Sequence, residues 1–219
     1  GHTRRKRRLT VLASSQGKQL SKYLQHLDDE FEIFVYTKSG AKLKHIIQDG
    51  LQFVRDFSVD DVIVILAGTN DVHLYEPYQL TLLQGMDALF DLNLNTNIVV
   101  CGCPCRYDDP TLNDDIQYFN SYMSRMVLNY DGVSRLHYLD INVFLQRTHL
   151  TRHGLHLNRH GKRLLSNQLS IFIKKTVMNG VENYYSSVAV AKQVPSKVQV
   201  FKNCDVPQSP EIRLIESFP

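Results

Sequence analysis

Residues 62–71 read Val-Ile-Val-Ile-Leu-Ala-Gly-Thr-Asn-Asp, an apolar run that stops at a polar turn. An unbroken apolar run of this length is typical of a parallel strand that is covered on both faces. The residues after it include a glycine, an asparagine and an aspartate, which favour tight loops. This stretch therefore predicts a central strand with a polar loop at its carboxyl end.

The same unit of strand, loop and helix recurs along most of the chain. We expect five strands, at residues 9–13, 31–36, 62–66, 98–101 and 136–139. Apolar residues at helical spacing predict helices between and after them, near residues 20–27, 43–54, 82–90, 116–127 and 164–177. Strands that alternate with helices form a parallel sheet between helical layers. The predicted fold class is a three-layer α/β/α sandwich with a five-stranded, mainly parallel sheet of the flavodoxin-like type.

The composition is that of an ordinary globular protein, with 43% hydrophobic and 21% charged residues among 219. No apolar run approaches the roughly 20 residues of a membrane-spanning helix, so no membrane insertion is expected. We expect one domain at residues 9–179, preceded by a basic lead-in at 1–8 and followed by an extended appendage at 180–219. The sequence favours an intracellular location, cytoplasmic or nuclear, and gives no indication of oligomeric state.

Five consecutive basic residues precede the first predicted strand: Arg4, Arg5, Lys6, Arg7 and Arg8. The formal net charge of the chain is only +3, too small to require a polyanionic partner by itself. Three interpretations of the basic stretch stay open, namely a solvated lead-in, a targeting signal and an arm that contacts the phosphates of RNA.

Three of the four cysteines, Cys101, Cys103 and Cys105, lie in one short segment, and Cys204 lies far from them. Their spacing lacks the paired pattern of a zinc site and does not indicate a disulfide framework. We expect free thiols in a reducing compartment and no bound metal.

Four residues that could carry chemistry stand at predicted loops. Ser15 follows the first strand, Gly40 the second, Asn70 the third, and His156 precedes the last long helix. A serine nucleophile needs a histidine base and hydrogen-bond donors for the oxyanion. In this interpretation His156 takes the proton of Ser15, and the oxyanion hole consists of the Ser15 and Gly40 amides with the Asn70 side chain.

The residues around these four positions form blocks in a fixed order. The blocks are Val-Leu-Ala-Ser-Ser-Gln-Gly at 11–17, Ser-Gly-Ala at 39–41, Gly-Thr-Asn-Asp at 68–71 and His-Gly-Leu-His-Leu-Asn at 153–158. Together they resemble the SGNH (GDSL-like) hydrolase family over residues 9–178. The third block is a full match, whereas Ala13 and Ser14 replace the glycine and aspartate of the first. Within the family, the chain is most similar to the esterase-like domains of some animal mobile-element reading frames.

The resemblance implies a serine esterase that removes a small acyl group through a covalent acyl-enzyme and needs no cofactor. The chain departs from the family at His153, which occupies the position of the aspartate that orients the catalytic histidine. Loss of that carboxylate is costly in serine hydrolases. Three alternatives stay open: a backbone carbonyl orients His156, another carboxylate does so, with Asp140 as the candidate, or catalysis is weak.

The alternative function is a catalytically weakened scaffold of the same fold that binds RNA or a protein partner. The lost aspartate, the basic stretch and the pair Lys162-Arg163 at the start of the last helix favour it. Retention of a nucleophile, oxyanion donors and a base favours the esterase instead. His149 and His160 are expected to be surface histidines, and a zinc site of His149, His153 and His156 lacks a further ligand nearby.

Overall fold

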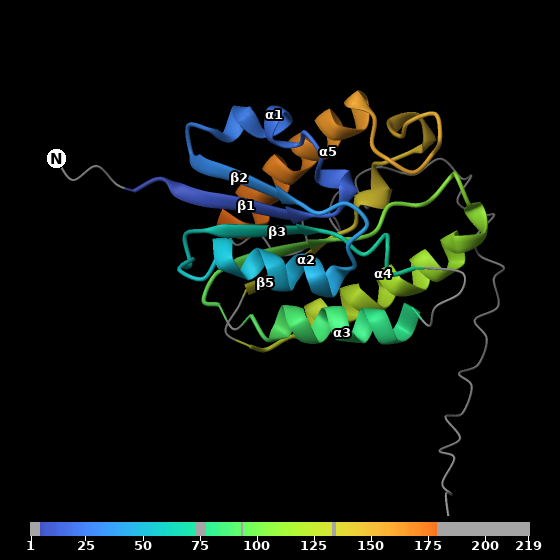
Figure 1. Cartoon of the computed structure of the whole chain (residues 1–219). Helices are drawn as coiled ribbons and strands as arrows, with labels where there is room; N and C mark the ends of the chain where they lie inside the picture. Colours follow the sequence, from blue (N-terminus) through green and yellow to red (C-terminus); the bar gives the residue numbers. More distant parts are fainter. Residues whose placement is uncertain (1–4, 73–77, 93, 133–134, 179–219) are drawn as a thin grey trace, which may run out of the picture. The chain divides into compact units, whose positions relative to one another are not determined.

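The computed structural model describes residues 5–72, 78–92, 94–132 and 135–178, and the predicted appendage at 180–219 lies outside them. Its centre is one five-stranded sheet with the strand order β2-β1-β3-β4-β5 (Figure 1). All four strand pairings are parallel. The strands are β1 (Arg7–Ala13), β2 (Phe31–Thr37), β3 (Val62–Leu66), β4 (Asn97–Cys101) and β5 (Arg135–Leu139).

Helices cover both faces of this sheet. The α-helices are α1 (Ser21–Leu24), α2 (Leu43–Gly50), α3 (Tyr78–Phe90), α4 (Asn113–Leu128) and α5 (Arg159–Phe172). Single turns of 3-10 helix are η1 (Ser15–Gly17), η2 (Gln25–Leu27), η3 (Leu51–Phe53), η4 (Pro110–Leu112), η5 (Ile141–Val143) and η6 (Arg147–His149), and a π-helical turn, η7 (Ile173–Met178), continues α5. In Figure 1, α1 and α5 lie on one face of the sheet, and α2, α3 and α4 lie on the other. The predicted three-layer fold is confirmed.

The core explains why the central strands contain so few polar residues. Every residue of β3 and β4 is buried, because helical layers cover both sides of these strands. Phe119 and Met123 of α4 are fully buried in the same core cluster as Ile63 and Ile98. Burial of such side chains supplies most of the driving force for folding, so the apolar pattern of these strands fixes the centre of the molecule.

The strand order places a topological switch between β1 and β3. From β1 the chain moves outward to β2, then returns past β1 to β3 and continues in the opposite direction to β4 and β5. Loops that leave the carboxyl ends of β1 and β3 therefore diverge, and such a divergence is where open α/β sheets bind ligands. Here the Ser14 N–H donates to the Leu66 carbonyl oxygen (3.0 Å), joining the ends of the two strands.

The first strand begins at Arg7, which corrects the expected boundary of the basic lead-in. Arg8 lies within the strand, and its guanidinium group forms ion pairs with Asp56 (2.8 Å) and Asp61 (2.9 Å). Arg5 also lies near Asp61, at 3.8 Å. These carboxylates come from a distant part of the sequence, which is why a local pattern did not reveal them. Arg8 is therefore a structural residue and not part of an exposed arm.

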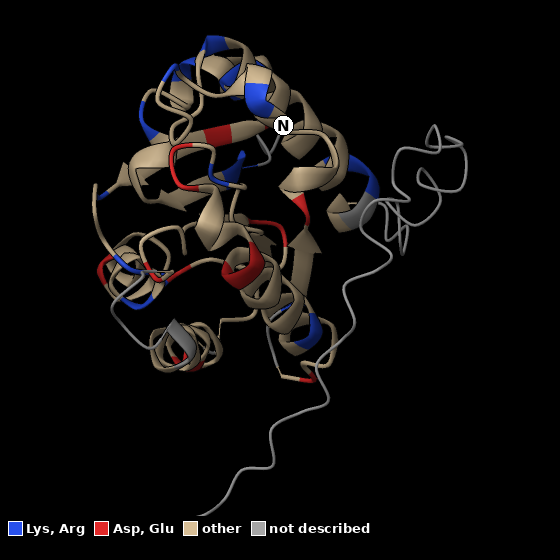
Figure 2. Ribbon diagram, turned by 90° about the vertical axis from the view of Figure 1, so that its right-hand side faces the viewer, with Lys and Arg blue, Asp and Glu red and all other residues tan. Residues whose placement is uncertain are grey.

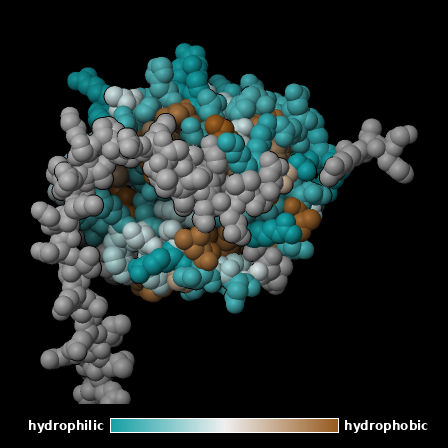
Figure 3. All heavy atoms as spheres, turned by 180° about the vertical axis from the view of Figure 1, so that it is seen from behind, coloured by the Kyte–Doolittle hydropathy of each residue, from teal (hydrophilic) through white to brown (hydrophobic). Residues whose placement is uncertain are grey.

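No helix in the described parts of the chain combines the length and apolar character needed to cross a membrane. On the face seen in Figure 3, the visible described residues are mostly hydrophilic, with small apolar patches between them.

Candidate active site

Ser15 begins the short turn that follows β1, and its side chain is half-buried. The turn lies directly against the sheet because Gly17 has no side chain. A Cβ atom at Gly17 would lie 2.4 Å from the Ala13 Cβ atom and 2.9 Å from the Thr37 Cγ2 atom. The preceding Ser14 is fully buried, and its hydroxyl has no hydrogen-bond partner among the described residues. The sequence thus holds Ser15 at the carboxyl edge of the sheet.

Gln16, the neighbour of Ser15, connects this turn to the loop that contains His156. Its side-chain Nε2 donates to the Leu155 carbonyl oxygen (2.7 Å), and its Oε1 accepts from the Leu157 N–H (3.1 Å). Gln16 is only 2% exposed, so both hydrogen bonds are shielded from water. The buried Gln16 side chain therefore forms hydrogen bonds with the backbone on both sides of His156.

The His156 loop is also held from within. The Thr151 N–H donates to the His156 carbonyl oxygen (2.7 Å). Asn158 caps α5 by accepting from the Gly161 N–H (2.9 Å), and its amide donates to the Leu150 carbonyl oxygen (2.8 Å). These hydrogen bonds hold the backbone of the loop that carries the His156 side chain.

The His156 ring itself is partly buried. Its Nδ1 atom is buried and has no hydrogen-bond partner among the residues that the structure describes. Burial lowers the pKa of His156, the positive charges of Lys18, Lys162 and His153 lower it further, and Asp108 acts in the opposite direction. The ring is thus biased towards the neutral form that a general base requires.

No hydrogen bond joins the side chains of Ser15 and His156 to each other in the described part of the chain. Apo sites often show long or unformed catalytic hydrogen bonds, so contact between these side chains stays a prediction. What the structure does bring together is the backbone of the two segments, through Gln16.

Neither candidate for orienting the His156 ring forms a hydrogen bond with it among the described residues. His153 is exposed and acts on His156 as a positive charge. Asp140 precedes η5, where its carboxylate accepts from the Asn142 N–H (2.9 Å) and the Asn142 side-chain amide (3.3 Å). The orienting roles of His153 and Asp140 therefore rest on the sequence alone.

Gly40 and Asn70 lie in adjoining loops. The Asn70 side-chain amide donates to the carbonyl oxygen of Ala41 (3.0 Å), the residue after Gly40. Gly40 has a φ of +74°, a conformation that favours glycine. Asp71 has a structural role, since its carboxylate accepts from the Leu43 N–H (2.8 Å) at the start of α2. The three loops that carry Ser15, Gly40 and Asn70 all leave the carboxyl edge of the sheet.

The sequence did not reveal the roles that four charged or polar residues have around His156. Gln16, Lys18, Lys162 and Asp108 contact or act on the His156 segment, but they come from three separate parts of the chain. The carboxylate of Asp108 is itself bound by Arg106, with the Nη2 atom at 2.6 Å and the Nε atom at 3.1 Å. No sequence pattern pairs these residues, although Gln16 lies in the block at 11–17 and Lys162 in the basic pair at the start of the last helix.

Two of the three clustered cysteines belong to the buried core. Cys101 and Cys103 are buried free thiols, and burial raises the pKa of Cys101 to about 12 and that of Cys103 well above its usual value. Such thiols stay protonated and unreactive. No group of metal-ligating side chains occurs among the described residues. His149 has another role, because its Nδ1 atom accepts from the Gln146 N–H (2.9 Å).

No protein-family model and no curated protein sequence matches the chain. Solved structures do match. They include a carbohydrate esterase of family 3 from Talaromyces cellulolyticus, with 12% identity, 79% of this chain and 99% of that chain covered, and a TM-score of 0.60. A GDSL-like lipase from Bacteroides thetaiotaomicron is 14% identical, with 78% and 89% covered and a TM-score of 0.60.

The catalytic domain of the peptidoglycan O-acetyltransferase OatA from Streptococcus pneumoniae is 12% identical, with 80% and 96% covered and a TM-score of 0.61. The chain has the SGNH hydrolase fold. At these identities the likeness concerns the fold alone. Within that fold, the four sequence blocks surround the carboxyl edge of the sheet.

Proposed function

We propose that this protein is a serine esterase that hydrolyses a small acyl ester through Ser15 and His156. The observation that carries the proposal is the pair of hydrogen bonds that the Gln16 side chain forms, one donated to Leu155 and one accepted from Leu157, which hold the Ser15 turn against the His156 loop at the topological switch of the sheet. A fully buried glutamine that serves two backbone groups in this way keeps the nucleophile and base segments in register.

The chemistry follows from the two side chains. His156 accepts the Ser15 hydroxyl proton while the Ser15 Oγ atom bonds to the acyl carbon, which gives a tetrahedral oxyanion. Collapse of this intermediate breaks the bond to the alcohol oxygen, and the alcohol leaves with the proton from His156. A water molecule, deprotonated by His156, then attacks the acyl-serine and releases the acid, restoring Ser15.

The oxyanion donors are the N–H groups of Ser15 and Gly40 and the side-chain amide of Asn70. Among the described residues, neither of these two backbone N–H groups donates to another backbone carbonyl. The Asn70 amide has two hydrogens, and its bond to Ala41 uses one of them. Each such donor is worth roughly a 10²-fold rate effect or more when it points at the developing charge.

The test combines covalent labelling with turnover. A fluorophosphonate probe should label the parent protein at Ser15, and 4-nitrophenyl acetate should be hydrolysed faster than in buffer. Both signals should vanish in Ser15→Ala, whereas exposed Ser21→Ala on α1 should keep them. A parent protein that neither labels nor hydrolyses the ester would refute the proposal, and labelling that survives in Ser15→Ala would place the nucleophile elsewhere.

A second candidate function, RNA binding by the same fold, has one structural observation in its favour. Arg159, His160 and Arg163 line a surface hollow of about 280 Å3 on the first turns of α5. Replacing Arg159 and Arg163 by alanine should weaken RNA retention and flatten its salt dependence, whereas exposed Arg125→Ala on α4 should not. Equal RNA retention by the parent, the Arg159/Arg163 variant and Arg125→Ala would exclude this surface as an RNA-binding site.

A further inference from the structure

Charge is distributed unevenly between the two helical layers. Residues 5–27 and 141–178 contain no aspartate or glutamate, although the chain as a whole carries 22 acidic residues. These two segments supply η1, α1 and α5, and α1 packs against α5 on the same face of the sheet. Figure 2 looks onto the carboxyl edge and shows lysine and arginine gathered on the upper layer, where Figure 1 places α1 and α5.

Two of these basic residues border the candidate active site. Lys18 follows the Ser15 turn, and its N–H donates to the Ser15 carbonyl oxygen (3.2 Å). Lys162 lies in the first turn of α5, where its N–H donates to the Asn158 carbonyl oxygen (3.0 Å). Both charges are near enough to His156 to lower its pKa. The two lysines therefore flank the base from the nucleophile side and from the helix side.

Lys18 and Lys162, placed beside Ser15 and at the start of α5, have charges that act on each other. Burial lowers the pKa of Lys162, and the charge of Lys18 lowers it further. Neither side chain forms an ion pair with a carboxylate among the residues that the structure describes. Holding two like charges together is unfavourable, and an anion between them would relieve the repulsion.

Asp108, the carboxylate that acts on His156, does not supply that anion. Asp108 acts on His156, but its carboxylate is held by two hydrogen bonds from Arg106. Because the charge of Asp108 is paired with Arg106, the border of the site formed by Lys18, Lys162 and His153 is basic.

We propose that Lys18 and Lys162 form an anion subsite beside Ser15 and His156, so that the preferred substrate is an ester bearing a carboxylate, sulfate or phosphate group. The inference rests on the proposed esterase function and names its substrate class. Lys18 and Lys162 are specificity-determining residues in this assignment, because each contacts the anionic group of the ester.

The kinetic test compares three esters: neutral 4-nitrophenyl acetate, mono-4-nitrophenyl succinate with the charge on the acyl group, and 4-acetoxybenzenesulfonate with the charge on the leaving group. The measured quantity is the ratio of kcat/KM for each anionic ester to kcat/KM for the neutral one. Lys18→Gln and Lys162→Gln should each lower this ratio by about tenfold for one of the two anionic esters, since a charge pair in a partly buried site contributes roughly that much.

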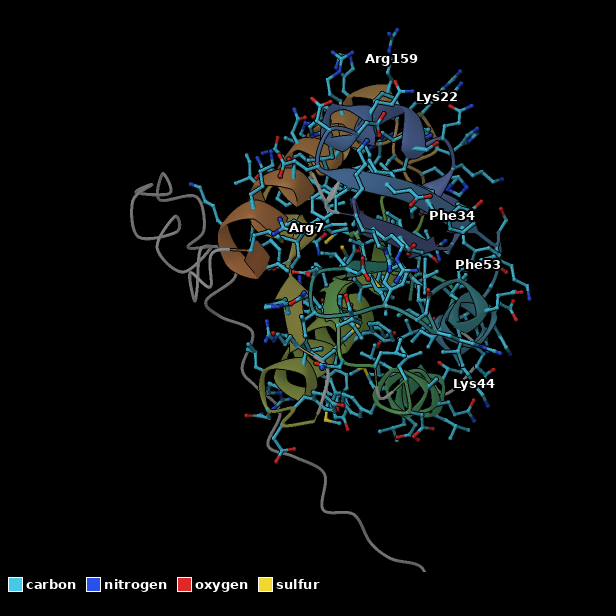
Figure 4. All side chains as sticks on the ribbon, turned by 90° about the vertical axis from the view of Figure 1, so that its left-hand side faces the viewer. Arg7, Lys22, Phe34, Lys44, Phe53 and Arg159 are labelled. Atoms are coloured by element: carbon cyan, nitrogen blue, oxygen red, sulfur yellow. The ribbon has the colours of Figure 1, made fainter. Side chains whose placement is uncertain are left out.

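Control variants distinguish a direct contact of Lys18 or Lys162 with the anionic ester from a general effect of the protein's positive charge. Lys22→Gln makes the same charge change on α1, where Figure 4 shows Lys22 pointing outward, and it should leave all three ratios unchanged. Lys18→Arg should preserve the ratio, and added salt should reduce it in the parent. Equal ratios in the parent, Lys18→Gln and Lys162→Gln would overturn the subsite even if the protein is an esterase.

A second measurement does not depend on turnover. The His156 ring signal, followed by NMR, should titrate with a higher pKa in Lys18→Gln and in Lys162→Gln than in the parent, because each variant removes a nearby positive charge. Inorganic sulfate should shift this signal in the parent and much less in the two variants. Absence of a sulfate effect in the parent would refute the subsite, whereas a sulfate effect without ester hydrolysis would refute only the esterase.

Discussion

At Gln16, one side chain joins two segments that lie far apart in the sequence. The hydrogen bond from its amide spans 139 positions to Leu155, and the bond that its oxygen accepts comes from Leu157. The turn carries Ser15 and the loop carries His156, but Gln16, the neighbour of Ser15, makes the connection between them. In the proposed esterase Gln16 is therefore a positioning residue, because its hydrogen bonds hold together the segments that carry Ser15 and His156.

Replacing Gln16 by alanine should lower kcat on 4-nitrophenyl acetate by about 10²-fold with little change in KM, because misplacement by an ångström has effects of that order. Stability should fall by roughly 1–3 kcal/mol, since two buried backbone groups lose their partner. Urea unfolding and steady-state kinetics on the same samples measure both effects. The control is exposed Gln25→Ala, and a Gln16→Ala protein with normal kcat would show that the Gln16 contacts do not position the site.

The His156 ring is held by no hydrogen bond at its buried Nδ1 atom among the described residues. Nearby His153 adds positive charge. His156 must be neutral to act as a base, so kcat/KM should fall as the pH drops through its pKa. Because that pKa is lowered from 6.5, the activity should persist to more acidic pH than an ordinary histidine allows.

His153→Asp should supply the missing carboxylate. An aspartate in this position would stabilise the His156 imidazolium and favour the productive tautomer, raising kcat by about tenfold, or ~1.4 kcal/mol. The same change should raise the pKa of His156 and move the acidic limb of the kcat/KM profile to higher pH. His153→Asn is the uncharged control. A His153→Asp protein that loses activity with an unchanged melting temperature would favour a Ser-His dyad instead.

Among the elements, α5 depends on a close approach to the loop before it. A Cβ atom at Gly161 would lie 2.1 Å from the His149 carbonyl oxygen, which is backbone and cannot rotate away. Asn158 caps the same turn and ties it to Leu150. The first turn of α5 and the His156 loop therefore form one rigid unit.

We expect Gly161→Ala to lower the free energy of unfolding by roughly 1–3 kcal/mol, because the added methyl group must displace backbone. Since the same displacement reaches His156, esterase turnover should fall as well. Chemical unfolding and kinetics measure the two effects, with exposed Arg163→Ala in the same helix as the control. Unchanged stability in Gly161→Ala would mean that the loop yields easily and does not hold His156 rigidly.

The elements also show how far the sequence predicts this molecule. The buried strands β3 and β4 are visible as apolar runs because both of their faces are covered. The helix expected at 20–27 is instead divided into α1 and η2, and Gln19 before it has a φ of +62°. Tertiary contacts decide such local breaks, and apolar spacing does not record them.

The sequence likewise predicts one part of the candidate site and not the other. The positions of Ser15, Gly40, Asn70 and His156 at loops could be predicted because each follows or precedes a recognisable element. The contacts of Gln16 could not, since they depend on how two distant loops meet. Among the described residues the His156 Nδ1 atom has no hydrogen-bond partner, and this property of the folded chain does not follow from the substitution at His153.

On the scale of the whole molecule, the edge of the sheet opposite the candidate site has a polar anchor of its own. Asp61, which is 2% exposed, accepts from the Arg8 N–H (2.8 Å) and the Ser58 N–H (3.0 Å) and pairs with the Arg8 guanidinium. Its carbonyl oxygen accepts from the Thr96 hydroxyl (3.0 Å), next to β4. The anchor therefore ties the amino ends of β1 and β4 together, while the candidate chemistry lies at their carboxyl ends.

This separation predicts a variant that changes stability and spares turnover. Burial by itself raises the pKa of Asp61, but the hydrogen bonds from Arg8 and Ser58 outweigh it, so the pKa lies below 3.8. A carboxyl group with a depressed pKa stabilises the fold above its unfolded value, and this contribution is lost as the pH falls through the folded value. Asp61→Asn should therefore be less stable than the parent by roughly 1–3 kcal/mol near neutral pH, and the difference should shrink below pH 3.8.

Urea unfolding at several pH values tests this expectation, with exposed Asp60→Asn as the control for a change of one charge. Because Asp61 lies at the far edge of the sheet, Asp61→Asn should hydrolyse 4-nitrophenyl acetate with the kcat of the parent at a temperature where both are folded. A stability difference that stays constant or grows in acid would show that the Asp61 carboxylate is not stabilised by Arg8 and Ser58. A fall in kcat without unfolding would show instead that strain at the amino edge reaches Ser15 along β1, the strand that connects Arg8 to the Ser15 turn.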